Sequence, residues 1–234
     1  MHSLMGHLAA ARISVIIAIC TFIPATSAAG MAEDGWVSLF DGRTLSGWVL
    51  EDGKSAADGW AVEDGALCRK SRAGSIITRQ QYLDFELEFE WKIAAGGNSG
   101  VKYRLHRIGE GSWLGPEYQI LDDTLSKDAQ SAATSTAALY LLKEPGPEKS
   151  VRPAGEFNQA RIVARGTILE HWLNGRKVLT MDTSSAEWRQ MLAAAKYSRS
   201  PGAQDWFARH AGPIMLQDHG SPVWFRSIRI RELK

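Results

Sequence analysis

Residues Phe85–Ile93 read FELEFEWKI, and this stretch decides the fold class. Apolar side chains occupy every second position, and the positions between them hold Glu86, Glu88, Glu90 and Lys92. Successive side chains of a β-strand point to opposite faces of a sheet, so this period of two predicts a strand with one buried and one solvated face.

The same signals recur on both sides of this stretch. Five further strands are predicted by their alternation or by the turns beside them: Val101–His106, Ala160–Ala164, Thr167–Leu173, Arg176–Met181 and Val223–Leu233. The pairs Asp64-Gly65 and Asn174-Gly175 predict tight hairpins, because their residues tolerate the positive φ that such turns require. Short strands joined by hairpins are typical of an all-β domain.

One helix interrupts this pattern. Ser184 and Glu187 have the spacing of a capping box, in which each side chain bonds a backbone amide at the start of a helix. The helix-forming run WRQMLAAAK follows, so we expect a helix from Ser185 to Lys196. Many strands and a single short helix predict an all-β, two-sheet antiparallel sandwich.

The first 28 residues have the order of a secretory signal peptide. The segment up to Arg12 holds one arginine and no acidic residue, Ile13–Ala25 is apolar, and small residues follow at Thr26 and Ala28. This order predicts a signal peptide over 1–28, a periplasmic or secreted protein, and one domain over 29–234. A retained membrane anchor, the alternative, would need about 20 apolar residues. We expect no membrane span in the mature form.

Charge and cysteine content exclude several classes of function. The chain has 27 Lys and Arg residues against 26 Asp and Glu residues, and the predicted signal removes only Arg12. This balance argues against a nucleic-acid partner, which would require a basic surface. Cys68 is the only cysteine after the predicted cleavage site, so an internal disulfide and a cysteine metal cluster are both excluded.

Two polar motifs suggest a ligand site. Asn98-Ser99-Gly100 combines a side-chain amide with glycine, which lets the backbone approach a ligand closely. Glu117 and Gln119, in GPEYQILDD, lie two residues apart and so on one face of a strand. A carboxylate beside an amide can hold adjacent sugar hydroxyls, or the carboxylate can act as an acid or base. The alternatives are a plain turn and a solvated strand face.

A third polar motif, LQDHG, lies near the C-terminus. Gln217 and His219 share a face if the strand extends that far, and the pKa of a histidine suits proton transfer near neutral pH. His171 is a weaker candidate, because its position within a predicted strand explains it.

Glu86, Glu88 and Glu90 have a specific alternative interpretation. Glu-Leu-Glu-Phe-Glu resembles the Glu-x-Asp-x-Glu strand of laminarinase-like glycoside hydrolases, except at its middle residue. Retaining hydrolysis requires two carboxyl groups about 5 Å apart, which alternate positions on one strand could supply. Because any amphipathic strand can show three glutamates, we expect these residues not to be catalytic.

Taken in order, the motifs of the chain resemble one family from Trp36 to Leu233. They are LFDGRTLSGW, WAVEDGALC, DFELEFEWK, NSGVKYR, GPEYQILDD, GEFNQARIVARGTILEHWLNG and GPIMLQDHGSPVWFRSIRIREL. Their joint order and spacing resemble the 3-keto-disaccharide hydrolase domain family. The resemblance implies a concanavalin A-like jelly-roll sandwich that acts on glycosides already oxidised to a ketone at carbon 3. The chain departs from the family pattern at Phe157, Ser135-Thr136-Ala137 and Ser227, where tryptophan, Thr-Gly-Ala and asparagine are more usual.

The chemistry of a 3-keto sugar explains these residue types. The ketone acidifies the proton on carbon 2, so a base can remove it, an enolate forms, and the leaving group departs from carbon 1. Water then adds to the resulting enone, and the net change is hydrolysis. Such a site needs a base, an acid for the leaving oxygen, and donors or a cation for the enolate.

These roles can be placed on the motifs that the chain shares with the family. Glu117 and His219 are the candidate base and acid, in either order, and we expect them to face one cleft on the concave sheet. The candidate substrate-binding residues are Asn98, Arg104, Gln119 and Gln217. No cofactor is certain, but a divalent metal near Asp122 and His219 could stabilise the enolate. The expected substrate is a small glycoside or oligosaccharide, and a separate sugar 3-dehydrogenase is an expected functional partner, because the ketone must be made elsewhere.

Two other functions remain open. A noncatalytic, lectin-like carbohydrate-binding module would use Trp113 and the Asn98-Ser99-Gly100 motif and would need no base. A laminarinase-like glycoside hydrolase would use Glu86 and Glu90. An assay of 3-keto and unmodified disaccharides side by side separates these two functions from the keto-sugar enzyme.

Overall fold

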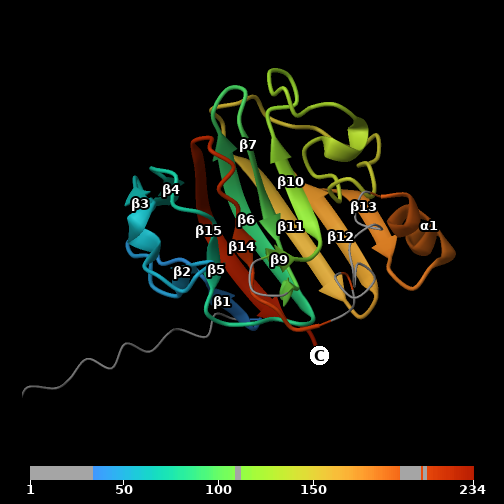
Figure 1. The fold of residues 1–234 in the computed structure, drawn as a ribbon, viewed down its shortest axis with the longest axis horizontal. Coiled ribbons are helices and arrows are strands. Elements are labelled where there is room, and N and C mark those ends of the chain that lie inside the picture. The colour runs from blue at the N-terminus through green and yellow to red at the C-terminus, as the bar shows by residue number, and fades with distance from the viewer. Residues whose placement is uncertain (1–33, 109–111, 196–206, 208–209) are drawn as a thin grey trace, which may run out of the picture. The chain divides into compact units, whose positions relative to one another are not determined.

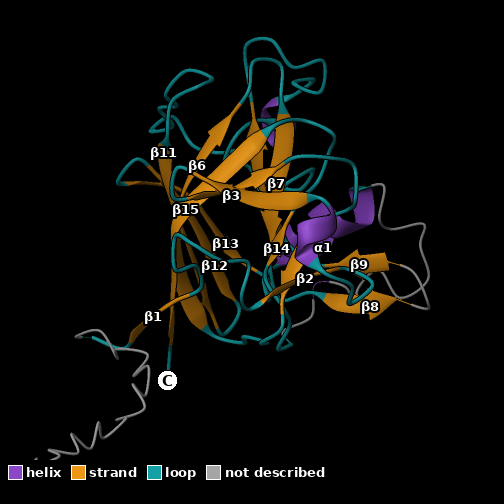
Figure 2. Cartoon of the chain, turned by 90° about the vertical axis from the view of Figure 1, so that its left-hand side faces the viewer, coloured by secondary structure: helices purple, strands orange, loops and turns teal. Residues whose placement is uncertain are grey.

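The computed structural model describes residues 34–108, 112–195, 207 and 210–234. The described chain forms two antiparallel sheets that pack face to face (Figures 1 and 2), which confirms the predicted all-β jelly-roll sandwich. The predicted signal peptide, 1–28, and the expected helix end at Lys196 lie outside the described residues. Within them, no helix combines the length and apolar character that crossing a membrane would require.

The larger sheet has eight strands. They are β1 (Trp36–Ser38), β3 (Trp60–Glu63), β4 (Ala66–Arg69), β6 (Phe85–Ile93), β11 (Asn158–Arg165), β12 (Ile168–Leu173), β13 (Arg176–Asp182) and β15 (Val223–Glu232). Seven of them follow one another in the order β13-β12-β11-β6-β15-β4-β3, and β1 pairs with β15. The FELEFEWKI segment is therefore β6, near the middle of this sheet.

The smaller sheet has five strands in the order β10-β7-β14-β5-β2. Their bounds are β2 (Trp48–Leu50), β5 (Ile76–Thr78), β7 (Asn98–Lys102), β10 (Glu117–Leu121) and β14 (Met215–Leu216). The remaining elements of the described residues are a hairpin of β8 (His106–Ile108) and β9 (Ser112–Leu114), the 3₁₀ turns η1 (Ala56–Asp58) and η2 (Ala132–Thr134), and one α-helix, α1 (Ala186–Ala194).

The hydrophobic core lies between the inner faces of the two sheets. The apolar positions of β6 are buried there, as the period of two predicts. Phe89 of β6 meets Tyr118 of β10 edge to face, with 5.8 Å between ring centroids. Tyr118 and Ile120 point into this core, so Glu117 and Gln119 point outward from the smaller sheet.

Two predicted hairpin turns are confirmed by their backbone angles. Asp64 and Gly65 have φ of 49° and 73°, and Asn174 and Gly175 have φ of 49° and 81°. Positive φ at both central residues is the signature of a type I′ turn, whose twist matches that of the strands it joins.

Two boundaries differ from the sequence prediction. The predicted strand Val101–His106 is broken at Arg104, whose φ is 48° and whose buried side chain turns toward the adjoining loops. The helix cap is Ser185 rather than Ser184: the Ser185 hydroxyl accepts a hydrogen bond from Trp188 N at 3.0 Å. Ser184 instead bonds the carboxylate of Asp182, which precedes it.

His171 joins the two layers inside the core. Its Nε2 accepts a hydrogen bond from the Tyr103 hydroxyl at 2.9 Å, and its Nδ1 donates to the Ala137 carbonyl oxygen at 2.9 Å. Burial outweighs the bond to Ala137 and lowers the pKa of His171 from 6.5 to about 4. The histidine is neutral in the fold and has a structural role, in agreement with its weaker standing as a catalytic candidate.

His171 should make the stability of the fold depend on pH. The unfolded chain binds a proton at this residue below pH 6.5, whereas the folded chain does so only near pH 4. Stability should therefore be constant above 6.5 and fall on acidification, by about 2 kcal/mol at pH 5. Urea unfolding at pH 7 and pH 5 measures this, with His219→Gln, which removes an exposed histidine, as the control. Equal stability at both pH values would contradict the buried, neutral state.

Candidate functional site

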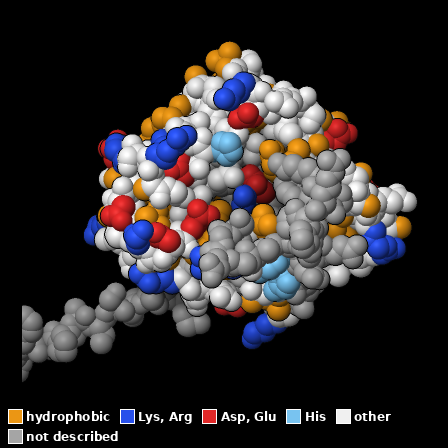
Figure 3. All heavy atoms as spheres, viewed as in Figure 1, with side chains coloured by type: hydrophobic (Ala, Val, Ile, Leu, Met, Phe, Trp, Pro, Cys, Tyr) orange, Lys and Arg blue, Asp and Glu red, His pale blue; other side chains and the backbone are white. Residues whose placement is uncertain are grey.

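The outer face of the smaller sheet carries the densest group of predicted site residues. β10 and β7 are antiparallel neighbours, and their register pairs Glu117 with Lys102 and Gln119 with Gly100. In Figure 1 these strands lie toward the viewer together with β14. Figure 3 shows the same side as spheres, with acidic and basic side chains near its centre.

Glu117 is held tightly at this face. Its side chain is only 9% exposed and forms an ion pair with Lys102, with 3.5 Å between Oε2 and Nζ. In the amide orientation that satisfies both its nitrogen and its oxygen, Gln119 donates to Glu117 Oε1 at 3.3 Å and to the Ser99 carbonyl oxygen at 3.0 Å. Gly100 leaves the space that the carboxylate fills, since a Cβ there would lie 2.6 Å from Glu117 Oε1. A fixed carboxylate paired with a cation can accept a proton from a bound molecule.

Tyr140 lies on the other side of Glu117. Residues Ala137 to Tyr140 run along the free edge of β10, where Tyr118 pairs with Leu139 and Tyr140 N donates to the Glu117 carbonyl oxygen at 3.1 Å. Glu117 and Tyr140 are therefore directly opposite residues on one face. Burial, together with the negative charges of Glu117 and Asp128, raises the pKa of the Tyr140 phenol.

Two amides complete the polar group. Asn98 Nδ2 donates to Asp128 Oδ2 at 2.8 Å, which fixes the amide at the start of β7. Gln217 N donates to the Gly100 carbonyl oxygen at 2.9 Å, so Gln217 lies beside Gly100 on the side opposite Gln119. Among the described residues, the buried amide oxygen of Gln217 has no hydrogen-bond partner. A buried acceptor of this kind suits a ligand hydroxyl.

Toward β2 the face continues as a buried apolar cluster with the partly buried Trp113 and the Glu51 carboxyl group beside it. Trp113 packs against a cluster that includes Val49, Ile77 and Met215, and its indole Nε1 donates to the Glu51 carbonyl oxygen at 3.2 Å. Burial raises the pKa of the Glu51 side chain, against the opposing effects of Lys102 and a backbone hydrogen bond from Ser75. Polar groups beside a tryptophan are typical of a surface that binds sugar rings.

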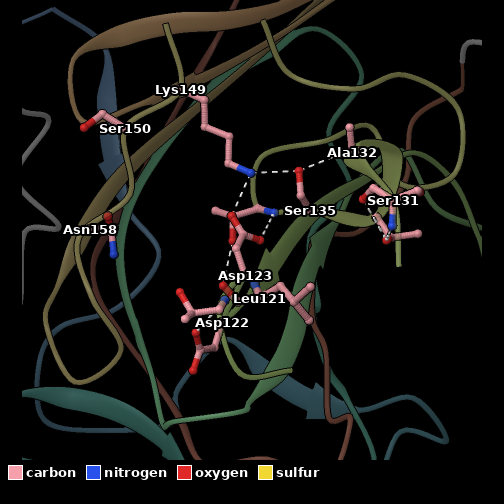
Figure 4. Close-up of polar contacts among 12 residues, drawn as sticks. Leu121, Asp122, Asp123, Ser131, Ala132, Ser135, Lys149, Ser150 and Asn158 are labelled. Carbon is pink, nitrogen blue, oxygen red and sulfur yellow. Dashed lines mark hydrogen bonds and ion pairs between the residues drawn. The ribbon is translucent and has the colours of Figure 1, made fainter. Parts of the chain in front are cut away.

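The loop that supplies Asp128 and Tyr140 is fastened to the end of β10 (Figure 4). Lys149 Nζ lies 2.7 Å from Asp123 Oδ2 and donates to Ser135 Oγ at 2.7 Å. Thr136 N donates to Asp123 Oδ1 at 2.8 Å. These bonds join three separate parts of the loop, so they set the position of the segment that reaches Tyr140.

Arg104 does not lie in this polar group, contrary to its predicted role in binding substrate. Its side chain is 4% exposed and forms an ion pair with Asp84 at 2.7 Å. Its guanidinium also donates to the carbonyl oxygens of Leu83 at 2.6 Å and Gly166 at 3.0 Å. Arg104 therefore ties loops of the two sheets together, because a buried charge must be paired and hydrogen-bonded.

The metal suggested near Asp122 and His219 gains no support from the side chains. The Asp122 carboxylate accepts hydrogen bonds from the backbone amides of Gly96, Thr124 and Leu125. Burial tends to raise its pKa, but these amides outweigh burial and lower it. In the described part of the chain, no three His, Cys, Asp or Glu side chains are close enough to hold an ion.

His219 lies away from Glu117 in the sheet register. β14 ends at Leu216, and Asp218 then bonds Arg69 and the backbone amides of Gly74 and Gly220, leaving His219 exposed on a turn. If β14 continued straight to His219, that residue would lie opposite Asn98. Its Cα atom would then be about 17 Å from the Cα atom of Glu117. The structure thus brings together Glu117, Gln119, Asn98 and Gln217, and adds Lys102 and Tyr140, which sequence reasoning missed.

Glu86, Glu88 and Glu90 point outward from the larger sheet, away from this group. They pair across β6 and β15 with Arg231, Arg229 and Arg226, respectively. Changing Glu88 or Glu90 to Gln should leave turnover of a keto substrate within about twofold and lower the unfolding free energy by about 1 kcal/mol at most. A loss of several orders of magnitude at Glu86 or Glu90, with the fold intact, would restore the laminarinase-like interpretation.

Comparisons with known proteins agree with this fold. The family model described as "3-keto-alpha-glucoside-1,2-lyase-like domain" matches residues 35–231. A 3-keto-disaccharide hydrolase of Bacteroides thetaiotaomicron is 32% identical over an alignment 231 positions long, which covers 86% of this chain and 79% of that protein. Crystal structures of candidate glycosyl hydrolases from Parabacteroides distasonis include one with a TM-score of 0.76 and 29% identity, covering 86% of this chain and 95% of the other. A second has a TM-score of 0.69 and 30% identity, with coverage of 85% and 99%. The chain belongs to the 3-keto-alpha-glucoside-1,2-lyase-like domain family.

Proposed function

We propose that this chain cleaves 3-keto glycosides at the outer face of the smaller sheet, with Glu117 as the base. The observation that carries the proposal is the arrangement of Glu117, which lies over Gly100 with a cation on one side and a phenol on the other. Membership of the family supports a carbohydrate substrate, and the name of the Bacteroides relative supports a keto-disaccharide.

The reaction follows from the acidity that a ketone on carbon 3 gives to carbon 2. Glu117 takes the carbon 2 proton, and the electron pair moves onto the ketone oxygen as an enolate. Lys102, which is adjacent to Glu117, can stabilise that oxygen through its ammonium group. The enolate then expels the oxygen on carbon 1, which leaves as an alcohol after gaining a proton. Water adds to carbon 1 of the enone, and a proton returns to carbon 2.

The amides around Glu117 have a separate task in this proposal. Asn98, Gln119 and Gln217 bind the hydroxyl groups of the sugar, and one hydroxyl donates to the Gln217 amide oxygen, which has no hydrogen-bond partner among the described residues. The ordered amides fix the ring so that the carbon 2 proton faces Glu117, since proton transfer needs a heavy-atom separation of about 3 Å. Trp113 and Glu51 lie farther along the face, where a second sugar of a disaccharide can rest.

The setting of the enzyme is also part of the proposal. The predicted signal peptide places the protein in the periplasm or outside the cell. Its substrate carries a ketone that an unmodified glycoside lacks, so a sugar 3-dehydrogenase must act first. We infer a functional link between the two enzymes on this chemical ground.

One side-by-side assay tests the proposed function. The protein is incubated with a 3-keto disaccharide and with the same disaccharide unmodified, and released sugar is measured. Release from the keto substrate alone is the expected result. Binding of either sugar without turnover would favour a lectin-like module, and cleavage of an unmodified glucan would favour a laminarinase-like hydrolase. Either of these outcomes overturns the proposal.

A further inference from the structure

We propose that Tyr140 is the acid that protonates the leaving oxygen on carbon 1, the role that the sequence suggested for His219. This inference rests on the proposed function and deepens it. Tyr140 lies outside every strand of the smaller sheet, and nothing in its local sequence marks it as a catalytic residue. The pairing of its segment with the edge of β10 brings it to the site.

The geometry of the pairing suits the two proton transfers. Directly opposite residues of an antiparallel pair have Cβ atoms about 5 Å apart, so the Glu117 and Tyr140 side chains project from neighbouring points of one face. The proton on carbon 2 and the oxygen on carbon 1 belong to adjacent ring atoms. A base and an acid that act on them must converge within the width of one sugar ring, as Glu117 and Tyr140 can.

His219 does not meet this requirement. Its Cα would lie about 17 Å from that of Glu117 even on a straight β14, and the turn at Asp218 ends the strand before that point. Lys102 is within reach of Glu117, but its ammonium is already paired with the base and is better placed for the enolate oxygen. Among the residues that the structure describes, Tyr140 is a proton donor whose position the register of β10 fixes beside the base.

The charges around Tyr140 explain why it donates its proton after Glu117 has accepted one. Burial and the carboxylates of Glu117 and Asp128 keep the phenol protonated, so it enters the reaction as a donor. When Glu117 takes the carbon 2 proton, its negative charge disappears, and one of the groups that oppose a phenolate is removed. The phenol then becomes more acidic at the stage when the leaving oxygen needs a proton.

The two transfers also balance over a full cycle. In elimination, the carbon 2 proton goes to Glu117 and the phenol proton goes to the departing oxygen. In hydration, the Tyr140 phenolate takes a proton from water as the water oxygen bonds to carbon 1, and Glu117 returns its proton to carbon 2. Both side chains end in their starting states, and the net change is the addition of one water molecule.

The experiment compares two leaving groups in Tyr140→Phe. The leaving group of a 3-keto disaccharide departs as an alkoxide and needs a proton from the acid. The leaving group of a 3-keto nitrophenyl glycoside departs as a stable phenolate and does not need one. In a single turnover, which follows release of the leaving group and not the later hydration, the variant should lose at least about tenfold in rate with the disaccharide and less than about twofold with the nitrophenyl substrate. Exchange of the carbon 2 proton with deuterated solvent should persist, because that step belongs to Glu117.

Two further variants sharpen the comparison. Tyr82→Phe removes a hydroxyl that bonds Gln80 elsewhere in the chain, and it should leave both activities unchanged. Tyr140→His restores a proton donor and should recover part of the disaccharide activity. Thermal unfolding of each variant checks the fold.

The outcomes separate the role of Tyr140 from the proposed function. Equal losses with both leaving groups, or no loss with the disaccharide, would overturn the role of Tyr140 and leave the proposed function standing. Failure of the unaltered protein to exchange carbon 2 protons or to cleave either keto substrate would overturn both.

Discussion

Glu117→Gln should lower turnover of a 3-keto disaccharide by about 10⁴-fold, at the upper end of the range for loss of a general base. Glutamine has the shape of glutamate and can still contact its neighbours, but its amide does not accept a proton at neutral pH. Lys102 loses its partner, although its side chain remains 19% exposed and can be hydrated. The unfolding free energy should therefore fall by about 1 kcal/mol at most.

Deuterium exchange at carbon 2 is the decisive measurement for this variant. It reports the first proton transfer alone, so Glu117→Gln should abolish it whatever the leaving group. Glu148→Gln is the matched control, because Glu148 forms an exposed ion pair with Arg176. If Glu117→Gln retains exchange and turnover near those of the unaltered protein, Glu117 is not the base.

Gly100→Ala should lower turnover by about 10²-fold without unfolding the protein. A methyl group at Gly100 would lie 2.6 Å from Glu117 Oε1 and 3.2 Å from its Cδ and Cγ. The backbone at Gly100 does not have a positive φ, so alanine is allowed there and the flexible carboxylate moves instead. A displacement of roughly 1 Å at a reacting group is enough for a loss of this size.

The control for this substitution is Gly146→Ala, another glycine without positive φ. A Cβ at Gly146 would make only an ordinary contact of 3.4 Å with the Val178 carbonyl oxygen. Both variants are compared for kcat with the keto disaccharide and for thermal unfolding. Full activity in Gly100→Ala would show that the position of Glu117 over Gly100 does not matter for the reaction.

Much of the fold could be predicted because local rules and tertiary packing agree there. The alternation in Phe85–Ile93 and the turn at Asn174-Gly175 depend on residues close together in sequence, and both are confirmed. The break at Arg104 could not be predicted, since arginine rarely adopts positive φ and does so here because a buried ion pair with Asp84 holds it. The backbone explains why asparagine is more usual in the family at the position of Ser227. Ser227 has φ of 52°, which asparagine tolerates well.

The candidate site was predictable only where its residues lie on a regular strand. Glu117 and Gln119 share a face because they are two positions apart in β10, and the sequence shows this directly. The alternating sequence around Lys102 predicts a solvated side chain. Its contact with Glu117 arises because β7 pairs with β10, in which the partner residue comes fifteen positions later. Tyr140 reaches Glu117 through an irregular segment, whose path no periodicity reveals.

The position of β15 has a consequence for when the protein can fold. This last strand pairs with β1, β4 and β6, and the ion pair between Glu90 and Arg226 joins residues 136 positions apart. The large sheet therefore cannot close until the C-terminal residues have been synthesised. Long-range pairing of this kind slows folding, and a chain still attached to the ribosome would keep one hydrogen-bonding edge of β6 unpaired. Removal of residues 223–234 should therefore abolish folding altogether, even though Glu117, Lys102 and Tyr140 would all remain in the chain.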